Sequence, residues 1–158
     1  MAKISADVVV DQLLAALAEA FDGPPEGFGY FLDRGDDAGL KNLLAKLSAA
    51  EASRKVAGSC IAAHVDHLAF ALEAAMDYIQ GGDSSKDWAE SWSVSTVDEA
   101  SWSRLRERLR QAYADLRQAI EAHALSSELA IGLAVGAPAH TAYHIGAIRQ
   151  KLALIRQG

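Results

Sequence analysis

Four of the five histidines fall into two clusters whose spacing suits a metal ion. His140 and His144 lie four residues apart in the segment HTAYHIGAIRQ. His64 and His67 lie three apart in the segment IAAHVDHL. Residues three or four apart share one face of a helix. Neutral imidazoles are ligands of zinc-like ions, and catalytic zinc sites combine three protein ligands with one open position. The spacing therefore predicts a metal site built across two helices.

The residues alone leave open which histidine of the second pair is the ligand, and whether the histidines bind a metal at all. Counting about 100° per residue, His64 lies about 60° and His67 about 120° from the centre of the apolar stripe, so His64 is expected nearer the core. A histidine beside an apolar face is also commonly a core residue with a hydrogen-bond partner, and such residues need no metal. The residue after His140 is Thr141, so the H-E-x-x-H motif of metalloproteases is absent.

Apolar residues recur at helical spacing in four long segments, and no segment alternates like a strand. We expect the first helix to begin near Ser5 and to end before Gly23, and the second to cover 59–80. A third helix should follow a capping box of Thr96 and Glu99. The sequence therefore predicts an all-α protein.

The last helix carries the His140–His144 pair, and its start has two possible positions. Pro138 lies either in the first turn, where its missing N–H is harmless, or inside a helix that begins near Glu128. The whole chain, 1–158, is then a single four-helix-bundle domain.

The connection between the first two long helices is long and contains a short helix at about 38–48. Ser48 and Glu51 form a capping box that starts a new turn. Phe28, Tyr30 and Phe31 are expected to anchor the Gly-rich and Asp-rich loop before this helix to the core. A second polar loop, 81–95, contains two tryptophans.

Composition limits the classes of partner. The chain has 158 residues, 51% hydrophobic residues and a net charge of -6. An acidic protein is poorly suited to nucleic acid or to an anionic membrane surface. No apolar run approaches the ~20 residues of a membrane span. With one cysteine, Cys60, and no signal-peptide pattern, we expect a cytoplasmic protein without nucleic-acid or membrane partners.

Both histidine segments, together with the Trp88–Trp92 loop and the Arg-rich helix after it, resemble the DinB/YfiT-like superfamily. The resemblance implies a four-helix bundle, commonly a homodimer, with three histidines holding a divalent metal such as Zn²⁺ or Ni²⁺. His140 and His144 match the ligands of the last helix. The following leucine favours His67 as the third ligand, with His64 as the alternate.

The resemblance also implies a function: a metal-dependent enzyme that transfers a small-molecule thiol onto an electrophile. Metal-activated hydrolysis fits the same ligands. The alternative is a noncatalytic binding or stress-response module that retains or has lost the metal. Two neighbours of the histidines have candidate roles. Asp66 either orients a ligand imidazole or is a solvated helix residue. Tyr143 either donates a hydrogen bond to a substrate or is a core or interface aromatic.

Overall fold

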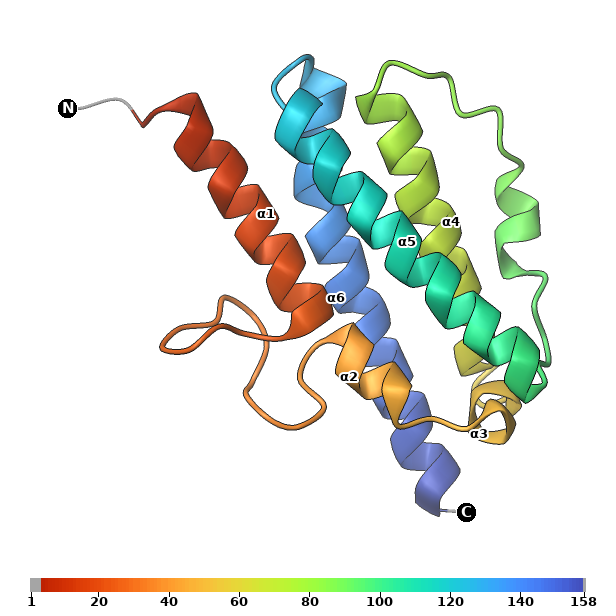
Figure 1. Cartoon of the computed structure of the whole chain (residues 1–158). Helices are drawn as coiled ribbons and strands as arrows, with labels where there is room; N and C mark the ends of the chain where they lie inside the picture. The colour runs from red at the N-terminus through yellow and green to blue at the C-terminus, as the bar shows by residue number, and fades with distance from the viewer. Residues whose placement is uncertain (1–3, 158) are drawn as a thin grey trace.

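The computed structural model describes residues 4–157, and these residues form helices but no strand. The long helices α1 (Ala6–Asp22), α4 (Ile61–Ile79), α5 (Glu99–His123) and α6 (Glu128–Gln157) pack against one another (Figure 1). The connections hold the short helices α2 (Leu40–Ala45) and α3 (Ala49–Ser53) and the 3-10 helix η1 (Trp88–Trp92). The predicted all-α fold is confirmed. Within residues 4–157, no helix combines the length and the hydropathy needed to cross a bilayer.

Helix α4 is the most deeply buried helix of the fold, because it packs against α5, α6 and η1. Many of its side chains are alanines, which let neighbouring helices approach closely. The fully buried side chains Ile61, Leu68 and Leu72 join Trp102 of α5 and Ile148 of α6 in one apolar cluster. Burial of such side chains contributes about 1.5–3 kcal/mol each. This cluster fixes α4 relative to α6, the two helices that carry the histidine pairs.

The loop after α1 is held by a buried carboxylate rather than by its aromatic residues. Glu19 is buried and accepts backbone hydrogen bonds from Tyr30, Phe31 and Leu32 at 2.6, 2.8 and 2.7 Å. Burial raises the pKa of Glu19, but the three hydrogen bonds together lower it by more. The net pKa therefore lies below the ordinary value. The predicted aromatic anchors are wrong, because Phe28, Tyr30 and Phe31 are between 41% and 67% exposed.

Two helix starts show which local signals decided the boundaries. The capping box of Ser48 and Glu51 is confirmed at α3. The predicted box of Thr96 and Glu99 is wrong, because α5 is capped by Asp98, whose carboxylate accepts from the Ser101 N–H at 2.7 Å. An aspartate directly before the first turn is itself a strong N-cap.

Helix α6 begins at Glu128, so Pro138 lies inside it and not in its first turn. A proline at this place removes one backbone hydrogen bond from the helix. The Thr141 hydroxyl donates to the Ala137 carbonyl at 2.8 Å one turn further on. The helix therefore continues through Pro138 and carries both histidines near its middle.

Candidate metal centre

Three histidines from two helices converge between α4 and α6. His140 and His144 lie one turn apart on α6, and His67 faces them from α4. One ring nitrogen of each lies within 4.8 Å of those of the other two. His144 is fully buried, and His67 is 9% exposed. These three histidines could hold a metal ion.

The separations are close to those of a metal site. A zinc ion with ligand bonds of 2.0–2.1 Å places two nitrogens of a tetrahedral shell roughly 3.3 Å apart. The Nε2 atoms of His140 and His144 are 2.9 Å apart. At this distance one imidazole donates a proton to the other. An ion would replace that proton, and the three nitrogens, which lie within 4.8 Å of one another, would draw together around it.

A serine of η1 determines which nitrogen of His67 is free. The Ser91 hydroxyl donates its only proton to the Trp88 carbonyl at 2.8 Å. Its oxygen, 2.9 Å from Nδ1 of His67, must then accept from the imidazole N–H. The proton on Nδ1 leaves a lone pair on Nε2. His67 is thus held in a tautomer that can bind a metal through Nε2.

His64, the alternate ligand, lies beside the group of three and has both ring nitrogens engaged. Its Nδ1 lies 2.9 Å from Nδ1 of His144, and its Nε2 lies 3.1 Å from the Ser59 hydroxyl. A histidine that contacts a metal ligand in this way fixes the tautomer and the ring orientation of that ligand. The four residues His64, His67, His140 and His144 are called the histidine cluster below.

A buried lysine holds the segment that places Ser59. Lys151 of α6 is buried and donates to the backbone carbonyls of Val56 and Ser59, the latter at 3.2 Å. Burial lowers the pKa of Lys151 below its ordinary value. Lys151 therefore ties the segment before α4 to α6, and through Ser59 it supports the position of His64.

The histidine cluster is uncharged at neutral pH. Burial lowers the pKa of His144 to about 3, with repulsion from the neighbouring imidazoles as a further cause. Burial and the nearby Lys151 cation lower the pKa of His64 to about 4. The pKa values of His67 and His140 are also lowered, chiefly by burial. Neutral imidazoles have the lone pairs that metal binding requires.

Aromatic side chains surround the histidine cluster. Trp92 of η1 stacks on His67 with ring centroids 4.3 Å apart, and Trp88 packs edge-on against Phe70. The Tyr143 ring meets His144 edge-on at 5.2 Å and is 69% exposed. Tyr143 is therefore not a core residue, and its exposed phenol remains available to a ligand. The partly exposed tryptophans and Tyr143 form an aromatic rim.

Asp66 has a different role from either of the expected ones. Its carboxylate is buried and accepts from Arg108 of α5 at 2.7 Å, and no hydrogen bond among the described residues joins it to a histidine. Burial raises the pKa of Asp66, and the Arg108 guanidinium opposes that rise. Arg108 also binds Glu73, so Asp66 belongs to an ion-pair network between α4 and α5.

Sequence reasoning missed Ser59, Ser91 and Lys151, the residues that orient the histidines. Ser91 lies in the predicted loop 81–95, whose short helix η1 no periodic pattern revealed. The burial of Lys151 could not be expected from the sequence, because lysine side chains are almost never buried. Ser91 and Lys151 have partners distant in sequence, and Ser59 lies before the helix that carries His64, so helical spacing carries no signal for them.

Comparisons of the chain with models of known protein families, with curated proteins and with solved structures found no match. The candidate metal centre therefore stands on the geometry of its residues.

Proposed function

We propose that this protein is a divalent-metal-dependent enzyme of the DinB/YfiT-like four-helix-bundle type. His67, His140 and His144 hold Zn²⁺ or Ni²⁺ in this proposal. The observation that supports it most is the convergence of their three ring nitrogens within 4.8 Å. Three imidazoles leave a fourth coordination position for a reactant, as in catalytic zinc sites.

The proposed reaction is transfer of a small-molecule thiol onto an electrophile. A divalent cation supplies one contribution, which is to lower the pKa of a thiol or water that binds it. In the transfer, a sulfur–carbon bond forms, the leaving group departs from that carbon and the thiol proton passes to solvent. Ser91 and His64 orient the imidazoles through hydrogen bonds of 2.9 Å each. The aromatic rim suits an apolar or aromatic electrophile.

The test begins with protein purified without an affinity tag or chelator. We expect about one equivalent of bound Zn²⁺ or Ni²⁺ by elemental analysis, and faster conjugation of cysteine or glutathione to chlorodinitrobenzene than in the absence of protein. Both should be lost in His144→Ala, whereas His123→Ala, a histidine outside the cluster, should retain both. Bound metal with hydrolysis of a nitrophenyl ester, but no conjugation, would replace the transferase assignment by that of a hydrolase.

One observation favours the noncatalytic alternative. A continuous row of hydrogen bonds runs from Ser59 through His64 and His144 to His140. Each of these hydrogen bonds is formed by a proton and requires no metal ion. A bundle that retains the histidines for structure would have this arrangement. Absence of bound metal, together with a melting temperature unchanged by added Zn²⁺ or Ni²⁺, would favour the binding or stress-response module.

The outer face of α6 supports the proposal of a homodimer. Between Glu128 and Arg149 this helix contains no acidic residue, lysine or arginine. Leu129 and Val135 are exposed on this face. Close packing of a second copy's α6 would cover this apolar surface. Light scattering of the full chain should give twice the mass of one chain, and a monomer would refute this part of the proposal.

A further inference from the structure

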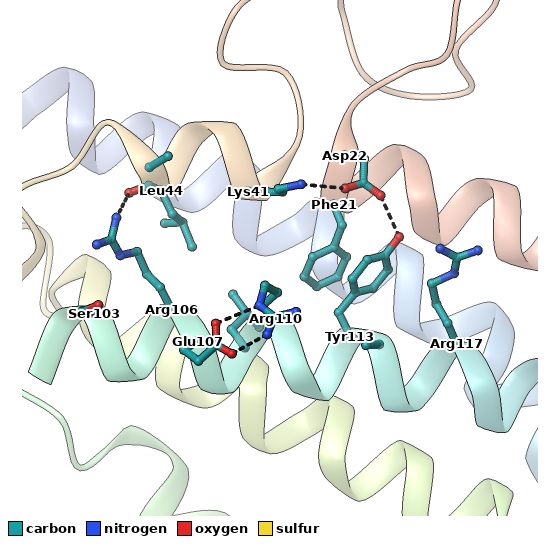
Figure 2. Close-up of a pocket in the computed structure, with 13 residues that line it drawn as sticks. Phe21, Asp22, Lys41, Leu44, Ser103, Arg106, Glu107, Arg110, Tyr113 and Arg117 are labelled. Atoms are coloured by element: carbon teal, nitrogen blue, oxygen red, sulfur yellow. Dashed lines mark hydrogen bonds and ion pairs between the residues drawn. The ribbon is translucent and has the colours of Figure 1, made fainter.

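A pocket of about 640 Å³ lies between α5, α2 and the end of α1, and no histidine lines it (Figure 2). Ligand pockets for small organic molecules measure roughly 300–1,000 Å³. This pocket is therefore large enough for a ligand of its own, separate from any reactant at the histidine cluster. Its lining includes three arginines, Arg106, Arg110 and Arg117, and we call it the arginine pocket.

The floor of the arginine pocket is apolar. Phe21, Leu44 and Leu109 line it, and each is almost fully buried. The Phe21 ring stacks on Tyr113 with centroids 4.1 Å apart and planes inclined by 11°. An apolar surface of this kind favours a hydrocarbon or aromatic body over a fully polar ligand.

The acidic residues of the pocket already have partners. Asp22 accepts from the Tyr113 hydroxyl at 2.9 Å and lies 3.9 Å from the Lys41 ammonium. Glu107 accepts from Arg110, one turn along α5. Figure 2 shows both sets of contacts along the pocket wall. Two cations and two carboxylates therefore balance each other, and two arginines remain.

Arg106 and Arg117 carry the unbalanced charge. Within residues 4–157, neither forms an ion pair with a carboxylate, and the buried Nε atom of Arg106 has no hydrogen-bond partner. Arg106 donates to the Leu44 carbonyl at a long 3.4 Å and lies over the Trp102 ring. A buried donor without a partner is destabilising, because it has lost its hydrogen bond to water. Arg117 lies over the Tyr113 ring, at the other end of the pocket in Figure 2.

We infer that the arginine pocket binds an organic carboxylate with an apolar or aromatic body. The carboxylate accepts hydrogen bonds from the Arg106 guanidinium, because guanidinium groups match carboxylates in a forked geometry. The body lies on the floor formed by Phe21, Leu44 and Leu109. A doubly charged phosphate monoester fits less well, because Arg106 and Arg117 lie at opposite ends of the pocket in Figure 2 and the charged end of one ligand meets a single unpaired guanidinium.

The test is calorimetric titration of naphthoate into the full chain after removal of metal by a chelator. We expect saturable binding at one site per chain, with neutral naphthamide and naphthyl phosphate each at least tenfold weaker. Arg106→Gln should weaken naphthoate binding at least tenfold. Arg104→Gln is the matched control, because Arg104 lies on the same helix outside the pocket lining and donates to the Ser101 hydroxyl. Ala45→Trp, at an exposed lining residue, should block binding without removing a charge.

Several results would overturn the inference. These are no saturable binding of naphthoate, equal weakening by Arg104→Gln and Arg106→Gln, or binding that survives both Arg106→Gln and Ala45→Trp. Tighter binding of naphthyl phosphate would refute the carboxylate assignment. The arginine pocket shares no residue with the three candidate metal ligands. His144→Ala should therefore leave naphthoate binding unchanged, whatever the outcome for the proposed function. Loss of naphthoate binding in His144→Ala would place the ligand at the histidine cluster instead.

Discussion

The histidine cluster and the arginine pocket differ in how their polar groups are satisfied. In the cluster, neighbouring imidazoles and two serines supply partners for ring nitrogens, and the imidazoles are neutral. In the pocket, two guanidinium groups have no carboxylate partner among the described residues. The first arrangement suits a small cation that replaces shared protons, and the second suits a ligand that brings a negative charge.

Acid should affect the stability of the protein most strongly through the histidine cluster. The folded pKa values of His64 and His144, about 4 and about 3, lie below the ordinary 6.5. At a pH between the folded and the unfolded pKa, each of these histidines binds a proton in the unfolded chain but not in the folded protein. Stability is therefore lost as pH falls below 6.5. Each such histidine contributes up to about 1.4 kcal/mol per pH unit in this window.

Urea unfolding of metal-free protein at several pH values measures this effect. We expect the free energy of unfolding to fall by about 3 kcal/mol between pH 6.5 and about pH 5 if two histidines contribute. His144→Gln should flatten the profile, because one buried imidazole is removed. A profile that is level across this window would contradict the description of the cluster as buried and neutral.

Two arginines on α5 allow the ion-pair network to be compared with the arginine pocket. Arg108 binds Asp66 and Glu73 on α4, whereas Arg110 binds Glu107 at the surface. Arg108→Ala leaves the buried Asp66 without its partner and should destabilise the protein by about 2 kcal/mol. Arg110→Ala, the matched control, should leave the unfolding midpoint unchanged. Equal midpoints for both variants would show that the network contributes nothing to stability.

Removal of the hydrogen bond from His67 to Ser91 should have a smaller effect than acid or than loss of Arg108. Ser91→Ala removes the oxygen 2.9 Å from Nδ1 of His67 but leaves all three candidate ligands in place. Loss of such a partner typically weakens metal affinity by roughly 10–100-fold, and we expect the lower end. Ser103→Ala, in the arginine pocket, is the control and should have no effect on zinc affinity in a competition titration with a chromophoric chelator.

The helices were predictable because one local pattern determines each of them. Apolar spacing predicted α4 and α5 to within a few residues, and the Ser48–Glu51 box predicted the start of α3. The start of α6 was not predictable, since a proline is compatible with both positions that the sequence allowed. The predicted N-cap of α5 was wrong because Asp98, two residues after Thr96, caps the helix instead.

The candidate site was predictable only in part. The spacing of His140 and His144 on one helix face is a local property, and the structure brings both beside His67. A helical wheel treats one helix alone, so it separated His64 from His67, although η1 covers α4 and both are buried. The prediction that aromatic residues anchor the loop after α1 was wrong for a similar reason, because a contact with another element decides it. A carboxylate in α1 holds the loop backbone, and no periodic pattern encodes that contact.

The most direct test of the metal centre is calorimetric titration of Zn²⁺ into chelator-treated protein. We predict one tight site per chain, at least a hundredfold weaker in His144→Ala and unchanged in His123→Ala, with equal helical content by circular dichroism in all three proteins. Absence of a tight site in the unsubstituted chain, or equal affinity in His144→Ala, would contradict the claim that His67, His140 and His144 hold a metal ion.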